Sequence, residues 1–221
     1  MSISKTVTIK APNFQKAVFE LVGTAPLVIH RFSAKTKAEM KQKMETGKAA
    51  SSKRNREPKS TDESYQESRY ISKAGWDGIH AGAFRNALIS ACRLVGFKMT
   101  LAKLSVFIEA DGFDAKDGIP LIRIYGQSET FTAHTRNSTG VVDVRPRPMY
   151  RQWAANLRIR FDADQFQVSD VINLISRVGL QVGIGAGRPD SKSSSGCGWG
   201  MFRVVESDGA PAVASRFGIQ A

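Results

Sequence analysis

The residues best suited to chemistry lie in a glycine-rich stretch near the C-terminus, VGIGAGRPDSKSSSGCGWGMFRVV at residues 182–205. Six glycines fall between residues 183 and 200, together with Arg188, Lys192 and serines at 191 and 193–195. Glycine lets a backbone adopt positive φ and approach another group closely. Adjacent backbone N–H groups can then form an anion nest, to which hydroxyls and cations add donors. This combination predicts a loop that holds a phosphodiester backbone rather than a base edge.

Two other phosphate-binding motifs do not fit this loop. A dinucleotide-binding fingerprint needs a strand, then glycines, then a helix, whereas here the helical pattern comes first and the strand last. A Walker loop needs G-x-x-x-x-G-K-[ST], which GAGRPDSKSS does not match. A flexible connector between a helix and a strand remains the open alternative.

The charge of the chain favours an anionic partner. The 221 residues carry 32 Lys and Arg against 20 Asp and Glu, a formal net charge of +12. A polyanion, above all a nucleic acid, is the usual partner of so basic a surface, and a basic but ordinary enzyme is the alternative. The chain shows neither a signal peptide nor an apolar run of membrane-spanning length, so we expect no membrane partner.

We expect no catalytic residues, no metal and no cofactor. The two cysteines, Cys92 and Cys197, are too far apart for a metal-ligand pair and indicate a reducing, cytoplasmic setting. The three histidines, His30, His80 and His134, stand in no catalytic spacing and are interpreted as surface or capping residues. The acidic residues between the predicted strands are interpreted as solvated loop carboxylates: Glu109, Asp111, Asp114 and Asp117.

The elements that would position the loop follow from hydrophobic periodicity. The order is strand 17–23, helix 81–96, strand 102–109, strand 154–161, helix 169–178 and strand 200–206. This βαββαβ order predicts an α+β, ferredoxin-like fold of the kind used by RNA-recognition domains. Ser169 is the expected N-cap of the second helix and Gly179 its end. Phe107 and Phe161, on the central strands, are expected in the core.

Two insertions interrupt this single domain of residues 1–221, at about 33–75 and 115–150, and 207–221 is a loose tail. The first insertion should contain a basic helix at 34–47 and a mobile arm at 48–68 that carries Lys53, Arg54 and Arg56. The second should contain a thumb-like hairpin, with strands at 120–126 and 129–136 turning around Gly126-Gln127. Segment 139–152, rich in Pro and Arg, should lie at a sheet edge.

The helix, glycine-rich loop and final strand, on a ferredoxin-like order, resemble the RAMP superfamily of CRISPR proteins. Residues 75–93, GWDGIHAGAFRNALISACR, are similar to that family's approach to its first helix, with Arg85 at the basic position and His80 where proline is usual. The likeness spans residues 16–32, 75–110 and 153–206, and the sequence as a whole also looks like proteins encoded by phages and prophages. In this family, some backbone subunits cleave RNA with a loop aspartate, for which Asp62 is the candidate here, although we do not expect cleavage.

The resemblance implies a non-enzymatic protein that binds single-stranded nucleic acid and assembles side by side along it, like a CRISPR effector backbone subunit, in a bacterial host cell. RNA is favoured and DNA is possible, as in a phage single-stranded DNA-binding or annealing protein. A protein that mimics or inhibits a host CRISPR complex, with CRISPR-type or phage proteins as partners, is the other alternative. The expected nucleic-acid-binding residues are Gly185, Gly187, Arg188, Lys192, Ser193, Ser194, Gly196, Gly198, Arg85, Lys53, Arg54, Arg56 and Arg136.

Overall fold

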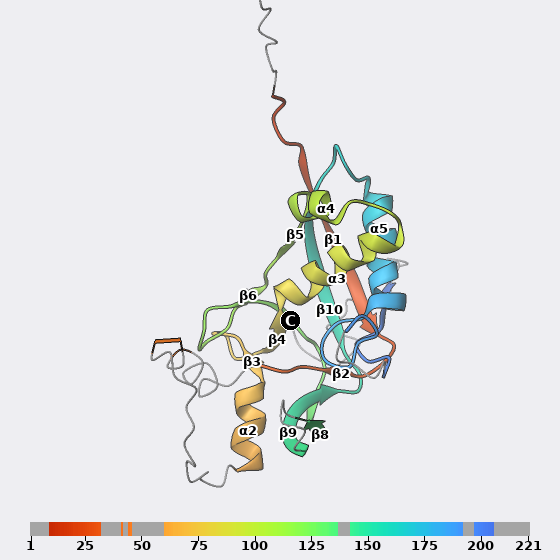
Figure 1. The fold of residues 1–221 in the computed structure, drawn as a ribbon. Coiled ribbons are helices and arrows are strands. Elements are labelled where there is room, and N and C mark those ends of the chain that lie inside the picture. Colours follow the sequence, from red (N-terminus) through yellow and green to blue (C-terminus); the bar gives the residue numbers. More distant parts are fainter. Residues whose placement is uncertain are drawn as a thin grey trace, which may run out of the picture.

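The computed structural model describes residues 9–31, 41, 44–45, 60–136, 142–191 and 197–205, with the side chains of 133–136 and 142–144 excepted. Within these ranges the chain combines α-helices with antiparallel sheets, which confirms the expected α+β class (Figure 1). Most of the helix expected at 34–47, the basic half of the arm with Lys53, Arg54 and Arg56, and the tail at 207–221 lie outside the described residues.

A four-stranded sheet and the two helices α3 and α5 form the centre of the molecule. The sheet has the order β11-β1-β10-β5, and each pair of neighbours is antiparallel. Two helices connect its strands, α3 between β1 and β5 and α5 between β10 and β11. The bounds are β1 Phe14–Gly23, α3 Ala81–Leu94, β5 Val106–Glu109, β10 Ala154–Asp162, α5 Val168–Arg177 and β11 Phe202–Val205.

The helices cover one face of this sheet and leave the other open. Along β10, Leu157, Ile159 and Phe161 are buried, whereas Arg158 and Arg160 between them are exposed. The buried set shares a single hydrophobic core with the apolar faces of α3 and α5. The expectation for Phe161 is therefore confirmed. That for Phe107 is wrong, because Phe107 pairs with Arg160 and so lies on the open face.

Two smaller sheets are built largely from the segments expected as insertions. One has the order β2-β9-β8 and the other β3-β4-β7-β6. Their bounds are β2 Leu27–Val28, β3 Tyr70–Ile71, β4 Asp77–His80, β6 Gly112–Phe113, β7 Pro120–Arg123, β8 Ser128–Arg136 and β9 Val142–Tyr150.

The prediction of a hairpin within 120–136 is wrong, because β7 and β8 belong to different sheets. Strand β8 pairs with β9 instead. Gly126, at φ 143°, directs the chain from one sheet to the other. The expected edge position of 139–152 is also wrong, since β9 is the middle strand. Its partner β2 pairs only with Met149 and Tyr150, however, so Pro146 lies beyond that pairing.

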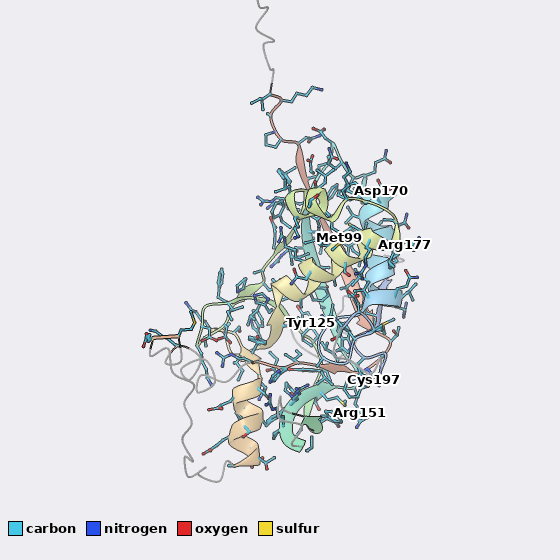
Figure 2. All side chains as sticks on the ribbon, in the orientation of Figure 1. Met99, Tyr125, Arg151, Asp170, Arg177 and Cys197 are labelled. Atoms are coloured by element: carbon cyan, nitrogen blue, oxygen red, sulfur yellow. The ribbon has the colours of Figure 1, made fainter. Side chains whose placement is uncertain are left out.

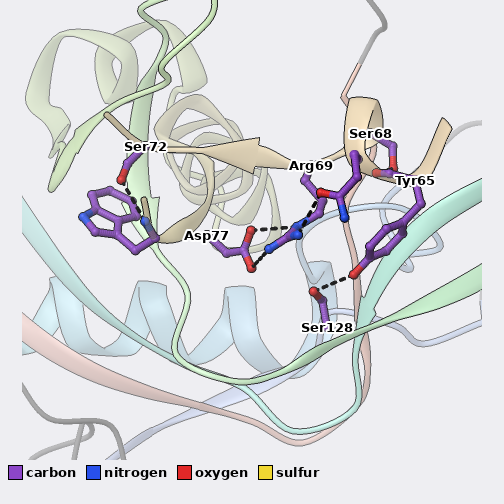
Figure 3. A network of polar contacts seen from close by, with 8 residues as sticks. Tyr65, Ser68, Arg69, Ser72, Asp77 and Ser128 are labelled. Carbon is purple, nitrogen blue, oxygen red and sulfur yellow. Dashed lines mark hydrogen bonds and ion pairs between the residues drawn. The ribbon is translucent and has the colours of Figure 1, made fainter. Parts of the chain in front are cut away.

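The acidic half of the expected mobile arm is a helix, α2 (Thr61–Ser68), which corrects the prediction for 48–68. Asp62 and Glu63 stand in its first turn, where their negative charges stabilise the helix by interacting with the positive end of its dipole. Tyr65 anchors it: the ring is buried and its hydroxyl lies 2.8 Å from the Ser128 hydroxyl of β8 (Figure 3). The Arg31 N–H also donates a 3.1 Å hydrogen bond to the Ser68 carbonyl, so α2 is held at its C-terminal end as well.

The strand expected over 101–110 is half helix. Residues Met99–Ser105 form α4, and only Val106–Glu109 are extended. The Ser105 hydroxyl donates a 2.9 Å hydrogen bond to the Leu101 carbonyl, which closes the last turn of α4. Helix formers at Leu101, Ala102 and Lys103 outweigh the apparent alternation.

Both expected boundaries of α5 are displaced. Its N-cap is Gln167 rather than Ser169, because Gln167 and Asp170 form a reciprocal capping box. Figure 2 shows Asp170 and Arg177 along this helix. The helix does not end at Gly179 but continues as a π-helical segment, η1 (Val178–Val182), before Gly183 at φ 70° ends it. Gly179 serves packing instead, since a Cβ there would collide with the Phe202 carbonyl.

Candidate nucleic-acid interface

A cleft of about 960 Å³ opens where α3, the glycine-rich loop, β9 and the segment after β2 meet. The glycine-rich loop forms one wall with Ile184–Arg188, and the β9 arginines lie in another part of the lining. The charged residues that line it among those described are Lys103, Arg145, Arg147, Arg188 and Asp190. Four cations thus face a single acid, and that acid already accepts a 2.8 Å hydrogen bond from Arg93.

The described glycines shape this wall by letting protein segments touch one another. Gly185 (φ 74°) lies against β2, where an added Cβ would be 2.5 Å from the Val28 carbonyl oxygen. Gly187 (φ 75°) lies beneath the Trp199 ring, and Gly200 (φ 68°) lies against the Ile184 carbonyl, each without room for a Cβ. These glycines are therefore required for internal packing, whereas Gly198 (φ 69°) has open space around it.

Three hydrogen bonds fix the loop near Arg188 and Asp190. The Arg188 guanidinium donates a 3.0 Å hydrogen bond to the Gly185 carbonyl, which holds the loop in a tight turn. Asp190 accepts hydrogen bonds from Ser90 and Arg93 of α3. These donors lower the pKa of the Asp190 carboxyl, so it is ionised at neutral pH. The loop is thereby attached to α3, which also lines the cleft.

Arg145 and Arg147 come from β9, where their spacing of two places both side chains on one face of the strand. Arg147 is half-buried, and its Nε has no hydrogen-bond partner among the described residues. Burial and the neighbouring charge of Arg145 lower the pKa of Arg147. Two like charges that lie close together repel each other, and an anion bound beside them would reduce that repulsion.

Two histidines complete the lining: His30, whose half-buried position corrects its interpretation as a surface or capping residue, and His80, which stands at the N-cap position of α3. His30 is half-buried, and burial together with the charges of Arg147 and Arg145 lowers its pKa to about 4. His80 precedes α3 at the N-cap position but makes no side-chain capping bond, and burial lowers its pKa. Both rings are neutral at pH 7 and can donate or accept one hydrogen bond.

The structure brings together only some of the expected site residues. Gly185, Gly187 and Arg188 line the cleft. Arg85 does not: its guanidinium donates to the carbonyls of Lys103 and Val106 and lies 5.3 Å from the centre of the Phe107 ring. Lys192, Ser193, Ser194 and Gly196 lie outside the described residues, and Arg136 is described only as the last backbone position of β8.

Sequence reasoning missed Lys103, Arg145, Arg147 and the histidines. The Arg-Pro-Arg pattern of residues 145–147 was a usable signal, because alternate residues of a strand share a face. Nothing in the sequence showed that β9 would be packed beside the glycine-rich loop. That neighbourhood depends on a tertiary contact, in which the Trp199 ring meets Phe131 of β8 edge-to-face at 5.2 Å.

The carboxylates between the strands accept hydrogen bonds from the protein itself. Asp114, expected to be solvated, is 1% exposed and accepts a 3.1 Å hydrogen bond from the buried Arg31, which corrects that expectation. Asp111 accepts from the backbone of Arg123 and from Arg158. Within the described ranges, His, Cys, Asp and Glu form no group that could hold a metal ion.

A scan of protein-family models matches no family to this chain, and comparison with curated proteins finds no significant match. In the part of the chain that the structure describes, no helix is both long enough and apolar enough to cross a bilayer.

Proposed function

We propose that this protein binds single-stranded nucleic acid, with the phosphodiester backbone in the cleft between α3, β9 and the glycine-rich loop. The observation that carries the proposal is the excess of cations over acids in the cleft. Among the described residues that line it, Arg145, Arg147, Arg188 and Lys103 face one acid, Asp190, which accepts a hydrogen bond from Arg93, and the Nε of Arg147 has no hydrogen-bond partner within the described ranges. Phosphate oxygens supply negative charge to these cations and an acceptor to that Nε.

The proposed fold is of the ferredoxin-like βαββαβ type, a modified RNA-recognition fold. The strand order β11-β1-β10-β5, the antiparallel pairing and the positions of α3 and α5 in the chain support it. The RAMP resemblance favours RNA and a non-enzymatic backbone subunit that assembles along the strand, in the cytoplasm of a bacterial cell. Side-by-side assembly would add affinity that one small domain lacks. We therefore expect the mass of the complex to grow with oligonucleotide length in light scattering.

The test is a salt titration of fluorescence anisotropy with labelled poly-U and poly-dT. Each phosphate contact to a single strand contributes about 0.7 to the slope of log K against log salt. The double variant Arg145→Gln/Arg147→Gln should weaken binding to both polymers and flatten the slope by about 1.4. The matched control Lys73→Gln/Arg177→Gln removes two cations that do not line the cleft and should leave the slope close to that of the native protein.

The same titration separates the alternatives. Tighter binding of poly-dT would favour a single-stranded DNA-binding or annealing protein over an RNA-binding one. Binding that the cleft variant leaves unchanged would refute the cleft as the site. If the protein binds neither polymer at low salt, the interaction protein that mimics or inhibits a CRISPR complex becomes the better hypothesis.

A further inference from the structure

The acid that lines the cleft, Asp190, is bound in the way that a phosphate group would be. Its Oδ2 accepts a hydrogen bond from the Ser90 hydroxyl, and its Oδ1 accepts one of 2.8 Å from the Arg93 guanidinium. Arg93 also donates a 3.2 Å hydrogen bond to the Ser90 hydroxyl, which holds the two donors side by side on α3. Hydroxyl and guanidinium groups are common donors to phosphate oxygens.

The same place attracts negative charge in the free protein. The hydrogen bond from Ser90, followed by the hydrogen bond and charge of Arg93 and the charge of Arg188, lowers the pKa of the Asp190 carboxyl. Asp190 therefore carries one full negative charge at neutral pH, as a phosphodiester group does. The groups that bind this carboxylate are suited to bind a phosphate in its place.

The position of the glycine-rich loop does not depend on the Asp190 carboxylate alone. The backbone N–H of Asp190 donates a 3.2 Å hydrogen bond to the Val182 carbonyl of η1. The Ala186 N–H donates one of 2.8 Å to the Val28 carbonyl of β2. Because these backbone bonds attach the loop to η1 and β2, we expect it to keep its conformation when the carboxylate loses its partners.

The ion pair between Arg93 and Asp190 can be exchanged at little cost. Their side chains are 59% and 34% exposed, and an ion pair so exposed to water contributes little to stability. The pair between Arg31 and Asp114 is different, because both side chains are 2% exposed and its separation would leave a charge in the interior. Arg93 is therefore able to change partner, whereas Arg31 is not.

We propose that Ser90 and Arg93 form a further phosphate subsite of the cleft, and that Asp190 fills this subsite in the free protein until a phosphate of the strand displaces it. Ser90 lines the cleft and Arg93 follows it three residues later on α3, so the subsite extends the cleft along that helix. The carboxylate competes with phosphate and thereby limits the affinity of the cleft. The inference rests on the proposed function for its natural ligand, but inorganic pyrophosphate tests it without a strand.

The first experiment compares Asp190→Asn with the native chain, by calorimetric titration with inorganic pyrophosphate and by anisotropy with labelled poly-U. The amide keeps an oxygen that can accept from Ser90 or Arg93 but loses the charge that competes with phosphate. We expect both ligands to bind at least about fivefold more tightly, and the salt slope for poly-U to steepen by about 0.7. Asp164→Asn is the matched control, because Asp164 accepts from Asn13 and does not line the cleft, so both affinities should stay unchanged.

The substitution Arg93→Gln separates a direct contact from a general change in charge. In the Asp190→Asn background it should remove the gain for both ligands and reduce the salt slope by about 0.7, because Arg93 is then the group that contacts the phosphate. In the native background it should cost less affinity, because there Arg93 must first leave Asp190. A gain that survives Arg93→Gln would overturn the inference, since it would come from net charge alone.

The two ligands distinguish failure of this inference from failure of the proposed function. If neither chain binds poly-U while pyrophosphate shows the gain that depends on Arg93, the subsite is supported and the proposed function is refuted. If the native chain binds poly-U and Asp190→Asn changes neither affinity, Asp190 only attaches the loop to α3. The inference then fails and the proposed function stands.

A measurement on the native chain keeps the test independent of how the variants fold, which thermal unfolding also checks. In ¹H–¹⁵N spectra, the Nε–H resonance of Arg93 should shift during titration with pyrophosphate, because its guanidinium changes partner. The resonance of Arg85 is the internal control, since its guanidinium donates to the carbonyls of Lys103 and Val106. An Arg93 resonance that stays as constant as that of Arg85 would overturn the inference.

Discussion

Gly200 lies against Ile184 so closely that no side chain fits at position 200. The Ile184 N–H donates a 3.1 Å hydrogen bond to the Gly200 carbonyl, while an added Cβ on Gly200 would overlap the Ile184 carbonyl oxygen. This contact joins the two ends of the glycine-rich loop. The loop is therefore a packed structure that presents Arg188 to the cleft, and its described glycines contact protein before they contact any ligand.

Substitutions at Gly200 and Gly198 should separate the energetic cost of a steric clash from the cost of a positive φ. Gly200→Ala should lower the free energy of unfolding by about 2–5 kcal/mol, from positive φ and from overpacking together. Gly198→Ala meets no neighbour within 4 Å, so only its φ of 69° opposes it, at about 1–2 kcal/mol. Urea denaturation measures both, and equal losses would show that the close contact at Gly200 has no energetic effect.

The ion pair between Arg31 and Asp114 should contribute strongly to folding. Both side chains are 2% exposed, so Asp114→Asn would leave a buried guanidinium with weakened compensation, at a cost of about 3 kcal/mol. Asp117→Asn is the matched control: Asp117 also pairs with Arg31, but its side chain is 26% exposed, and we expect a cost of about 1 kcal/mol. Chemical denaturation measures the free energy of unfolding of both variants. A larger decrease for Asp117→Asn than for Asp114→Asn would contradict the prediction.

Arg147 should reduce stability in the free protein while it promotes binding. Arg147→Met keeps the aliphatic packing but removes a charge close to Arg145 and a buried nitrogen that has no hydrogen-bond partner among the described residues, so we expect a gain of about 0.5–1 kcal/mol in unfolding free energy. The same variant should bind single strands more weakly. Differential scanning fluorimetry and anisotropy measure the two effects. A variant that loses stability would show that the guanidinium is compensated in the native fold.

Acid should destabilise the free protein through His30. The pKa of His30 is about 4 in the folded chain against about 6.5 when unfolded, so the unfolded state binds more protons between these values. The stabilising contribution is complete above pH 6.5 and is lost as pH falls towards 4. We expect about 2 kcal/mol after allowing for the partial exposure of the ring. His30→Gln should flatten that part of the stability profile, whereas an unchanged profile would assign the titration to another group.

Binding should have the opposite pH dependence. A phosphate in the cleft offsets the charges of Arg145 and Arg147 and raises the pKa of His30, so binding takes up a proton. Affinity for poly-U should therefore increase as pH falls from 7 to about 5, and His30→Gln should reduce this increase. Anisotropy in buffers of matched ionic strength measures the effect, and affinity independent of pH would place the strand away from His30.

Much of the central layer could be predicted from local pattern. The alternation of β10 and the helical spacing of α3 each repeat over enough residues to outweigh exceptions. The predictions for short segments, or for segments of mixed pattern, were wrong. The run at 101–110 contains both a helix and a strand, and α2 depends on the burial of Tyr65 against β8, which no local pattern shows.

For the candidate site, the sequence by itself determined the amount of positive charge, the glycine-rich loop with Arg188, and the alternation that puts Arg145 and Arg147 on one face. Only the tertiary structure decided which of these residues meet. It placed β9 and His30 beside the loop, turned Arg85 to backbone carbonyls of α4 and β5, and left Arg160 between two rings on the open face. The physical reason is that local preferences fix the direction of a side chain along its own element. Which elements become neighbours depends on the burial of apolar residues far apart in the chain, such as Phe131 against Trp199.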